Sequence, residues 1–376
     1  MHILRIAQNV YPDVSGGAPY HVHAMSRDQA AMGHDVTVLT TLEDSELPEI
    51  EKRDGYTVVR VSPGVTLLGN DVSPAVARYL WGVESEAFDV IHAHSHLYFA
   101  TNLAALKRRL GDIPLAITNH GLYSQNAPEW VFRQYLRTLG RWTYNRADVA
   151  FCYTEVDKER LREFGVTTRV EVVPNGIDTE RFTPDGPESE LIDHDGPVVL
   201  FVGRLVEGKR PGIAIEAFAE VLEEYPDAGM YLCGDGSLRE GLETQVEELG
   251  IKEAVTFLGD VPYDEMPKVY RSGDVLVLPS RAEGVPRTVL EAMSSDVAIV
   301  VSDLEQITAV VGDTGRHVTF DDQEQIVSEV KNVLDTDGAV SNERDRIVER
   351  CRWQDTVAKT TRVLESTTTG SSGSDG

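Results

Sequence analysis

Two adjacent stretches decide the fold: the apolar run Asp274-Val-Leu-Val-Leu-Pro-Ser280 and, after it, Glu283-Gly-Val-Pro-Arg-Thr-Val-Leu-Glu291. The apolar run predicts a short buried strand that ends in a turn. Pro286 suits the first turn of a following helix, because the N–H that proline lacks would have no partner there. We therefore expect Glu283 in a strand-to-helix loop and Glu291 about one and a half turns into the helix.

Two carboxylates in such a place suit a ligand that carries both hydroxyls and phosphate. In open α/β sheets, ligands bind outside the carboxyl ends of the strands. Carboxylates accept hydrogen bonds from hydroxyl groups, and a helix N-terminus attracts an anion. On spacing alone, a solvated loop glutamate and a second glutamate on a helix surface are the simpler explanation.

Length and charge limit the class of protein. A chain of 376 residues exceeds one ordinary hydrophobic core, so we expect two domains. The net charge of −27, from 35 basic and 62 acidic residues, argues against nucleic-acid binding. We interpret the acidity as a halophilic-type composition, since salt screens self-repulsion. No apolar run reaches the roughly 20 residues of a membrane span.

The cysteines and the N-terminus predict a cytoplasmic protein. Cys152, Cys233 and Cys351 are scattered and form no CxxC pair, so neither disulfides nor a structural zinc site is expected. The chain enters directly into the strand-like Ile3-Leu-Arg-Ile6, with no signal-peptide pattern.

The N-terminal half reads as a strand–loop–helix–strand unit. Residues 3–7 predict a strand, a helix follows to about Met32, and residues 34–39 predict a second strand. The loop between the first strand and the helix contains Gly16-Gly17, which lets a ligand approach the backbone closely. GxGxxG is absent, so the dinucleotide fingerprint is missing.

Histidines gather at two further predicted strands. His92, His94 and His96 alternate along the strand that begins near residue 89, so we expect them on one face. A metal site is one interpretation, and histidines without a metal are the favoured one. His120 follows the strand of residues 115–118 directly, which predicts a place at the carboxyl end of the sheet.

A second α/β unit begins with the strand of residues 197–202. Arg204 and Lys209 follow in the strand-to-helix loop, and Pro211 begins the helix. An arginine can grip phosphate with two hydrogen bonds, and a lysine can act as a point charge. As a bare pair they fit an ordinary surface better than a phosphate site. The Walker pattern GxxxxGK[ST] is absent.

These motifs together resemble the retaining glycosyltransferases of GT-B architecture, glycosyltransferase family four. The segment Ser280–Met293 is similar to the family's Glu-x7-Glu segment, and residues 204 and 209 have the spacing of its diphosphate clamp. Val172-Val-Pro-Asn-Gly-Ile-Asp178 resembles its interdomain crossover. Where this chain has Asp296 and Ala298, family members usually have Gly and Pro, which affects the turn after the motif helix.

The resemblance implies an α/β fold of two Rossmann-like domains that face a central cleft. We expect an N-terminal acceptor-binding domain over residues 1–183 and a nucleotide-sugar-binding domain over residues 184–346. A helix over residues 347–365 would return to the N-terminal domain. The low-complexity tail, residues 366–376, is expected to be disordered.

The resemblance also implies the chemistry. A sugar would pass from a UDP- or GDP-linked donor to a glycan or lipid-linked acceptor, with retention of configuration and without a metal or cofactor. The implied catalytic residues are His120, Arg204, Lys209 and Glu283. The implied donor-binding residues are Gly16, Gly17, Arg204, Lys209, Gly284, Val285 and Glu291. A glycoside hydrolase, a nucleotide-sugar epimerase and a non-catalytic nucleotide-sugar-binding protein are the alternatives.

The predicted helix from about Glu129 to Asn145 has one apolar and one basic side. At 100° per residue, the apolar side collects Val131, Phe132, Tyr135, Leu136, Leu139 and Trp142. Trp130, Arg133, Arg137 and Arg141 fall on the opposite side. A solvated face explains the arginines equally well. The hypothesis is that this side contacts anionic lipid, so that the protein is peripheral on the inner face of the cell membrane.

Overall fold

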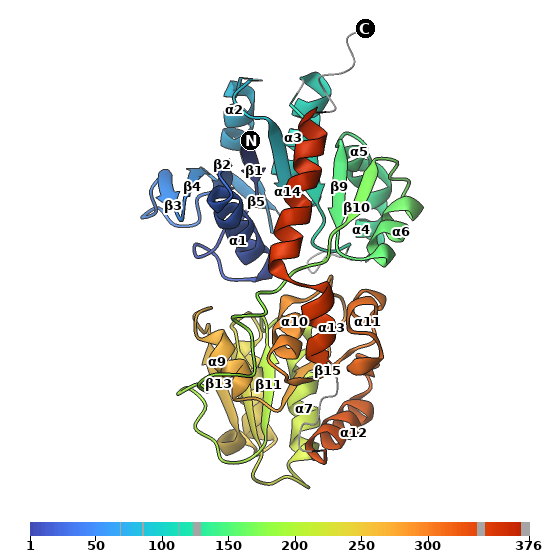
Figure 1. The fold of residues 1–376 in the computed structure, drawn as a ribbon. Coiled ribbons are helices and arrows are strands. Elements are labelled where there is room, and N and C mark those ends of the chain that lie inside the picture. Colours follow the sequence, from blue (N-terminus) through green and yellow to red (C-terminus); the bar gives the residue numbers. More distant parts are fainter. Residues whose placement is uncertain (68, 85, 112, 123–128, 337–342, 370–376) are drawn as a thin grey trace. The chain divides into compact units, whose positions relative to one another are not determined.

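The computed structural model describes residues 1–67, 69–84, 86–111, 113–122, 129–336 and 343–369. The chain divides into two compact units, each built on its own mostly parallel sheet (Figure 1). The first unit comprises Met1–Pro174 and the C-terminal segment from Asp355, and the second comprises Asn175–Gln354. This α/β pairing of two sheet units agrees with the predicted fold class.

The first unit is a sheet of eight strands covered by helices. Its strands are β1 (His2–Ile6), β2 (Asp35–Thr41), β3 (Ile50–Arg53), β4 (Tyr56–Val61), β7 (Val90–His94), β8 (Leu115–Thr118), β9 (Val149–Cys152) and β10 (Arg169–Val172), with a separate hairpin of β5 (Val65–Leu67) and β6 (Asn70–Val72). Its helices are α1 (Gly17–Ala31), α2 (Pro74–Gly82), α3 (Phe99–Leu110), α4 (Glu129–Tyr135), α5 (Arg141–Tyr144), α6 (Glu155–Glu163) and most of α14 (Trp353–Thr369).

The strand order of the first sheet is β10-β9-β8-β7-β1-β2-β4-β3. All neighbours run parallel except β3, which is antiparallel to β4 at the edge. The order reverses between β1 and β7, so the carboxyl ends of these two strands mark the switch point of the sheet.

Each face of this sheet packs on a different set of helices, as in a doubly wound fold. On one face, side chains of α2, α3, α5 and α6 such as Leu80, Ala104 and Leu161 join the core with Leu4 and Ile91. On the other face, α1 and α14 contribute the remaining core. The buried apolar runs read from the sequence therefore become strands covered on both sides.

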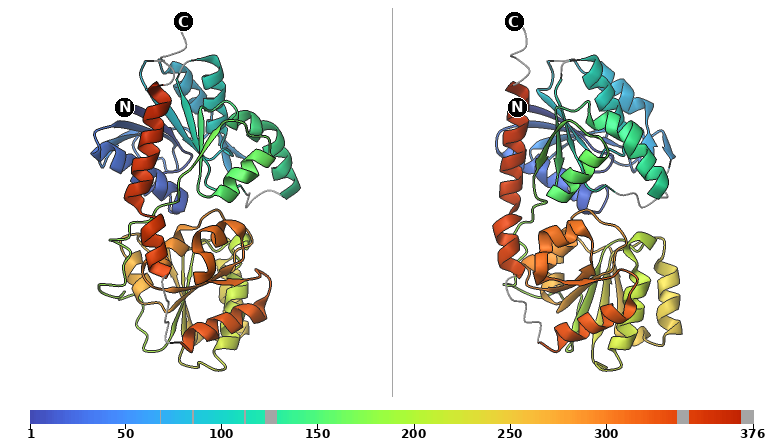
Figure 2. Two further views of the ribbon diagram at one scale, coloured as in Figure 1. Left: turned by 45° about the vertical axis from the view of Figure 1, so that its right-hand side comes forward. Right: turned by 90° about the vertical axis from the view of Figure 1, so that its right-hand side faces the viewer.

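The last helix, α14, belongs to the first unit although it follows the second unit in the chain. It lies along the sheet in both views of Figure 2, and Val363 and Leu364 enter the core. The predicted helix over residues 347–365 is two helices, α13 (Glu343–Arg350) and α14. Residues 366–369 continue α14, so this part of the predicted disordered tail is helical. Residues 370–376 lie outside the described residues.

The second unit repeats the design with six parallel strands. Its strands are β11 (Val198–Val202), β12 (Gly229–Cys233), β13 (Val255–Gly259), β14 (Val275–Leu278), β15 (Ala298–Ser302) and β16 (Arg316–Val318). Its α-helices are α7 (Pro211–Val221), α8 (Arg239–Glu248), α9 (Met266–Arg271), α10 (Arg287–Ser294), α11 (Glu305–Val311), α12 (Gln323–Leu334) and α13 (Glu343–Arg350). The order β13-β12-β11-β14-β15-β16 is that of a Rossmann sheet, with its switch point between β11 and β14.

The division between the units falls earlier than the expected boundary at residues 183–184. Residues 175–183 pack with the second unit. Phe182 is fully buried there, with its ring 5.7 Å from that of Tyr263 and 5.9 Å from that of Tyr270. The Pro-, Gly- and acid-rich composition that suggested a linker begins only after this anchor.

The predicted continuous helix from Glu129 to Asn145 is interrupted. A π-helical turn, η1 (Leu136–Gly140), separates α4 from α5. A π turn holds more residues than an α turn, so the faces after it are rotated. Leu139, expected on the apolar side, is 46% exposed, whereas Phe132 and Leu136 are buried as expected.

The turn after α10 forms despite the departure from the family pattern. Asp296 has a φ of 63°, in the left-handed region that glycine usually occupies. Aspartate tolerates this conformation better than most residues. The turn then leads directly into β15, which begins at Ala298.

Candidate active site

The loop after β11 carries the two predicted phosphate-binding residues. Arg204 is exposed, and Lys209 ends a short 3-10 turn, η2 (Glu207–Lys209). Arg210 follows with a left-handed φ of 54° and caps the start of α7. A non-glycine residue held in this conformation stores strain, which is typical of functional loops.

Lys209 forms an ion pair with Glu283, which lies in the loop after β14. β11 and β14 are hydrogen-bonded neighbours, so the pair joins the two loops on either side of the switch point. The backbone supports this junction, since the Arg281 N–H donates to the Gly208 carbonyl at 2.9 Å. Two predicted catalytic residues thus meet where open sheets bind ligands.

The Glu283 loop is fixed from two directions. Gln306 Nε2 donates to the Glu283 carbonyl at 3.1 Å, and Asn175 Nδ2 donates to the Val285 carbonyl at 2.9 Å. Glu283, Gly284 and Val285 are all buried. Pro286 was expected in the first helical turn, but it is the N-cap, with an extended ψ of 127°. The loop therefore stays extended one residue further than predicted.

Glu291 lies in a separate cluster on α10. Its Oε2 accepts a hydrogen bond from the Tyr270 hydroxyl at 3.0 Å, and its Oε1 accepts one from the Tyr263 hydroxyl at 2.9 Å. Arg287 Nε lies 3.6 Å from Oε1. Burial raises the pKa of Tyr270 well above its usual value, so this tyrosine stays a neutral donor.

In the first unit, His120 follows β8 and is half-buried. Its Nε2 lies 2.9 Å from His94 Nδ1, and its Nδ1 lies 2.7 Å from the Tyr153 hydroxyl. The rings of His94 and His120 stack with centroids 5.2 Å apart. Burial lowers the pKa of His120 to about 4. At neutral pH the imidazole is therefore neutral and can both donate and accept a hydrogen bond.

Strand β1 contributes a buried arginine with neutral partners. The Arg5 guanidinium is 0% exposed and donates to Ser26 Oγ at 2.7 Å and to Gln29 Oε1 at 2.5 Å. Its Nη2 lies 3.4 Å from His92 Nδ1. Burial lowers the pKa of Arg5 to about 9. Burial, with the Arg5 charge as a further cause, holds the pKa of His92 well below its usual value.

Two of the three alternating histidines share one face as expected, since the rings of His92 and His94 lie 4.5 Å apart, but His96 does not. Ser95 adopts a φ of 66° after β7 and turns the chain, so His96 contacts the Tyr144 hydroxyl, 2.9 Å from its Nδ1. His92 instead lies 2.8 Å from the Thr118 hydroxyl. Among the residues that the structure describes, no group of three or more His, Cys, Asp or Glu side chains has a geometry that could hold a metal ion.

Gly16 and Gly17 stand exposed at the N-terminus of α1, in the first unit. Gly16 is the N-cap, with a φ of 145°. A Cβ at Gly16 would meet only the Pro19 ring, at 3.5 Å or more. The glycine is thus required by its backbone conformation rather than by crowding.

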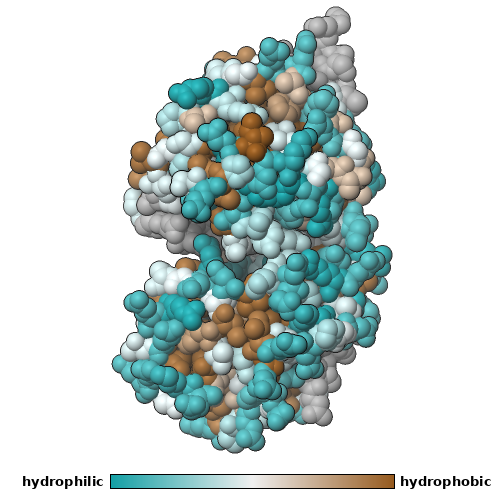
Figure 3. All heavy atoms as spheres, turned by 90° about the vertical axis from the view of Figure 1, so that its left-hand side faces the viewer, coloured by the Kyte–Doolittle hydropathy of each residue, from teal (hydrophilic) through white to brown (hydrophobic). Residues whose placement is uncertain are grey.

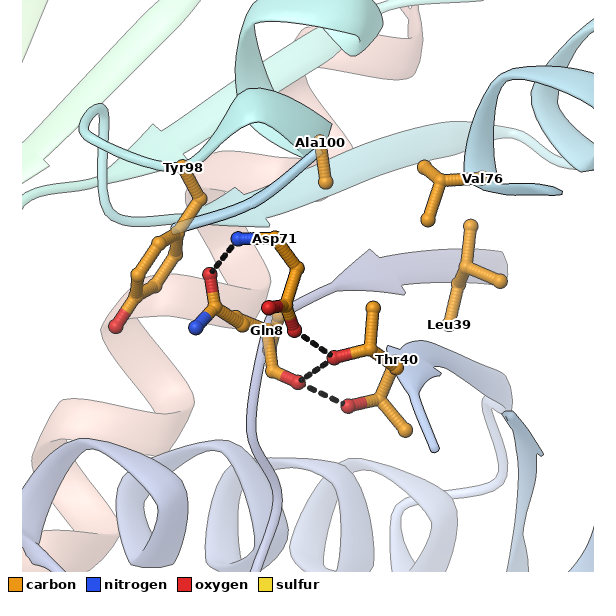
Figure 4. Close-up of a pocket in the computed structure, with 9 residues that line it drawn as sticks. Gln8, Leu39, Thr40, Asp71, Val76, Tyr98 and Ala100 are labelled. Atoms are coloured by element: carbon orange, nitrogen blue, oxygen red, sulfur yellow. Dashed lines mark hydrogen bonds between the residues drawn. The ribbon is translucent and has the colours of Figure 1, made fainter. Parts of the chain in front are cut away.

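A small cavity lies at the carboxyl ends of β1 and β2 (Figure 4). Its volume of ≈ 10 Å³ is about that of one water molecule, too small for a sugar. The Gln8 side chain points toward the main-chain nitrogen of Asp71, and the Asp71 carboxylate points toward a threonine hydroxyl. The Asp71 N–H donates to Gln8 Oε1 at 3.1 Å. The hydroxyls of Thr41 and Thr66 donate to the Asp71 carboxylate at 2.8 and 2.7 Å. This network fastens the β5–β6 hairpin to the sheet.

Sequence reasoning missed the partners of the predicted site residues. Tyr153 directly follows β9, at the same edge of the sheet as His120, and this position was the available signal. Arg287 stands four residues before Glu291, the spacing of a helical ion pair. Tyr263 and Tyr270 lie 28 and 21 residues from Glu291, and no local pattern connects them to it.

Two family models together match most of the chain. Residues 15–181 match the model of Glycosyltransferase Family 4, and residues 183–353 match that of Glycosyl transferases group 1. An uncharacterized glycosyltransferase of Methanocaldococcus jannaschii is 28% identical, over 97% of this chain and 98% of that protein. A GDP-mannose-dependent phosphatidylinositol monomannoside mannosyltransferase of Mycolicibacterium smegmatis is also 28% identical, over 88% of each chain.

Solved structures define the class of fold. Sucrose-phosphate synthase from Thermosynechococcus elongatus superposes with a TM-score of 0.84 at 19% identity, over 97% of this chain and 98% of that one. Anabaena HepE in complex with UDP-glucose gives 0.79 at 20% identity, over 97% and 100%. The chain has the GT-B architecture of two Rossmann-like domains, and it is a glycosyltransferase that uses a nucleotide-sugar donor. It belongs to the group 1 glycosyltransferases, with an N-terminal domain of glycosyltransferase family 4.

On the face that Figure 3 shows, hydrophilic residues cover much of the surface, and hydrophobic residues gather in the middle of the second unit. None of the helices within the described ranges is long and apolar enough to cross a membrane.

Proposed function

We propose that the chain transfers a sugar from a UDP- or GDP-linked donor to an acceptor hydroxyl, with retention of configuration. The observation that carries the donor assignment is the Lys209–Glu283 ion pair at the switch point of the second sheet. In this assignment Arg204 and Lys209 bind the diphosphate, and Glu283 accepts hydrogen bonds from the hydroxyls of the transferred sugar.

The reaction breaks the bond between the anomeric carbon and a phosphate oxygen, and forms a bond from that carbon to the acceptor oxygen. Negative charge develops on the leaving diphosphate. Arg204 and Lys209 stabilise this charge where it appears, which is the largest electrostatic task of the step. The proton of the acceptor hydroxyl leaves with the nucleoside diphosphate or to water.

The remaining predicted residues complete the donor site. Gly284 and Val285 present a buried loop backbone beside the α10 N-terminus, and Glu291 accepts hydrogen bonds from the ribose hydroxyls. His120 contacts the donor sugar as a neutral imidazole, which its lowered pKa supports. Gly16 and Gly17 offer an approach to the backbone at the start of α1.

For the acceptor we propose a lipid-linked molecule at an anionic membrane surface, on the inner face of the cell membrane. Trp130 is 74% and Leu139 46% exposed, and Arg133, Arg137 and Arg141 are exposed around them. In a chain of net charge −27, such a basic and apolar group fits anionic lipid. The π turn contains Leu139, so an apolar side chain of this segment is exposed as well as Trp130.

The experiment is a panel of nucleotide sugars tested for nucleoside diphosphate release, with and without a crude acceptor lipid fraction. A transferase releases the diphosphate faster when the acceptor is present. An epimerase gives an isomeric nucleotide sugar without acceptor and without net release of nucleoside diphosphate. A hydrolase releases the diphosphate at a rate that the acceptor does not change, and a binding protein shows only saturation. Any of these three results contradicts the proposal. The panel must include both bases, since the similar proteins named above include a GDP-mannose-dependent enzyme and one bound to UDP-glucose.

A further inference from the structure

Three side chains hold the carboxylate of Glu291 in one orientation. Tyr270 and Tyr263 each donate to a different carboxylate oxygen, at 3.0 and 2.9 Å. Glu291 and Arg287 are only 4% and 7% exposed, and Tyr270 is 0% exposed. Water therefore has little access to this cluster, and its internal hydrogen bonds determine how the carboxylate lies.

Arg287 sets the direction of the hydrogen bond from Tyr263. Its Nη2 donates to the Tyr263 hydroxyl oxygen at 3.0 Å. That oxygen is thereby the acceptor for Arg287, so the proton of the hydroxyl is directed at Glu291. The result is a relay from a fixed cation, through a hydroxyl, to a buried carboxylate.

The guanidinium of Arg287 is itself anchored at sites distant in sequence. Its Nη1 donates to the Gly176 carbonyl at 3.0 Å, and its guanidinium carbon lies 5.8 Å from the centroid of the Trp353 ring. Gly176 and Trp353 are next to the first and last residues of the second unit in the chain, Asn175 and Gln354. The main chain there is also tied together, since Trp353 N–H donates to the Ile177 carbonyl at 2.9 Å. The relay thus starts from a rigid support.

A carboxylate has about four acceptor positions, two on each oxygen. The tyrosine hydroxyls occupy one on each oxygen of Glu291. Arg287 Nε, 3.6 Å from Oε1, is beyond hydrogen-bond distance, so one position on each oxygen remains for a ligand. Two vicinal hydroxyls, as in the 2′,3′-diol of a ribose, match that remaining pair. A ligand that lacks one of these hydroxyls leaves a buried acceptor unsatisfied, which is costly.

We propose that Arg287, acting through Tyr263, is a positioning residue that orients Glu291 toward the ribose diol of the donor. The site is thereby selective for ribonucleotides over 2′-deoxyribonucleotides. This inference rests on the proposed role of Glu291 in donor binding. Arg287 and Tyr263 do not touch the reacting carbon, so they act on affinity and selectivity.

The test is calorimetry on the full chain with UDP and GDP, each beside its 2′-deoxy counterpart. The quantity measured is the ratio of the two dissociation constants. For the wild type we expect the ribonucleotide to bind about tenfold tighter or more, as a hydrogen bond to a charged group implies. Tyr263→Phe and Arg287→Gln should bring the ratio close to one, mainly by weakening the ribonucleotide. The double variant should bind the ribonucleotide no more weakly than either single variant, because the two residues act as one relay.

The matched control is Tyr225→Phe, which removes another tyrosine–carboxylate hydrogen bond, to Asp335, in the same unit. It should keep the wild-type ratio. Should Arg287→Gln fail to fold, Tyr263→Phe decides, because this half-buried residue loses a single hydroxyl.

Three results would overturn the inference, and they are distinguishable. A selective wild type with an equally selective Tyr263→Phe variant removes the relay but leaves the donor role of Glu291 intact. If the wild type binds the ribonucleotide and its 2′-deoxy counterpart equally well, Glu291 does not contact the ribose diol. A wild type that binds none of the nucleotides contradicts the proposed donor site as a whole.

Discussion

The Lys209 ammonium and the Glu283 carboxylate form an ion pair between the loops that follow β11 and β14. The two side chains are 12% and 4% exposed. Both loops leave the carboxyl ends of neighbouring parallel strands where the strand order reverses. A diphosphate bound by Lys209 would share the ammonium with Glu283 and free carboxylate acceptor positions for sugar hydroxyls. One ion pair thus relates the charge of the leaving group to recognition of the sugar.

The first prediction concerns Glu291→Gln. The amide replaces one acceptor oxygen by a donor, which faces a tyrosine hydroxyl that also donates. We expect nucleoside diphosphate affinity to fall about tenfold or more, and the free energy of unfolding to fall by roughly 1–3 kcal/mol. Calorimetry and urea denaturation measure the two effects. Glu248→Gln, at an exposed position on α8, is the control. Unchanged nucleotide affinity would remove Glu291 from the site.

The second prediction is a loss of stability in mild acid. Burial lowers the pKa of His96 to about 3 and that of His120 to about 4, against 6.5 for an unfolded histidine. Between these values the unfolded chain binds more protons than the folded one, so the free energy of unfolding rises with pH there. The stabilisation is present above about pH 6.5 and is lost as the pH falls toward 4 and 3.

Urea denaturation at a series of pH values measures this slope. In His96→Asn, the slope between pH 6.5 and 4 should be shallower by about one proton. His34→Asn, at a half-buried histidine outside the cluster, should change it less. Equal slopes for the wild type and His96→Asn would show that His96 does not titrate with unfolding.

The third prediction is that activity survives chelation. Arg204 and Lys209 supply positive charge at the proposed diphosphate site, so a divalent ion is not needed in principle. Transfer is measured with EDTA and with an equal ionic strength of a non-chelating salt, because salt also affects folding of a chain of net charge −27. Complete loss with EDTA, restored by Mg²⁺ or Mn²⁺, would overturn this prediction.

The fourth prediction concerns the surface of α4, η1 and α5. The wild type should float with anionic liposomes at low salt, and the triple variant Arg133→Gln, Arg137→Gln, Arg141→Gln should remain below. Each basic residue near an anionic surface contributes about 1 kcal/mol, so three removals weaken binding by roughly a hundredfold or more. Removal of Arg239, Lys252 and Lys268 from the second unit is the charge-matched control. If the two triple variants float equally, the three arginines do not bind the membrane and form an ordinary solvated helix surface.

Much of the fold could be predicted because the strands are buried on both faces. Runs such as Leu115–Thr118 and Val198–Val202 are short, apolar and bounded by turns, and each became a strand. Pro211 correctly marked the start of α7. The π turn at Leu136–Gly140 could not be predicted, since it contains no residue that distinguishes it from an α-helical turn.

The candidate site was predictable in its residue types but not in its contacts. The positions of Lys209 and Glu283 after successive strands indicated that they would be near one another, and they form an ion pair. Glu291 is different, because its orientation depends on Tyr263 and Tyr270 from other elements. Likewise the burial of His96 follows from one backbone angle at Ser95, which a strand periodicity does not contain.

The most direct test of the central claim is the rate of sugar transfer by Lys209→Ala and Arg204→Ala, with Lys268→Ala as the control on α9. Removing one charge-stabilising group from such a site typically slows the reaction by about 10²–10³. We predict losses of this size for Lys209→Ala and Arg204→Ala, with unchanged circular dichroism, and a wild-type rate for Lys268→Ala. Near-wild-type kinetics for either Lys209→Ala or Arg204→Ala would contradict the assignment of the diphosphate site.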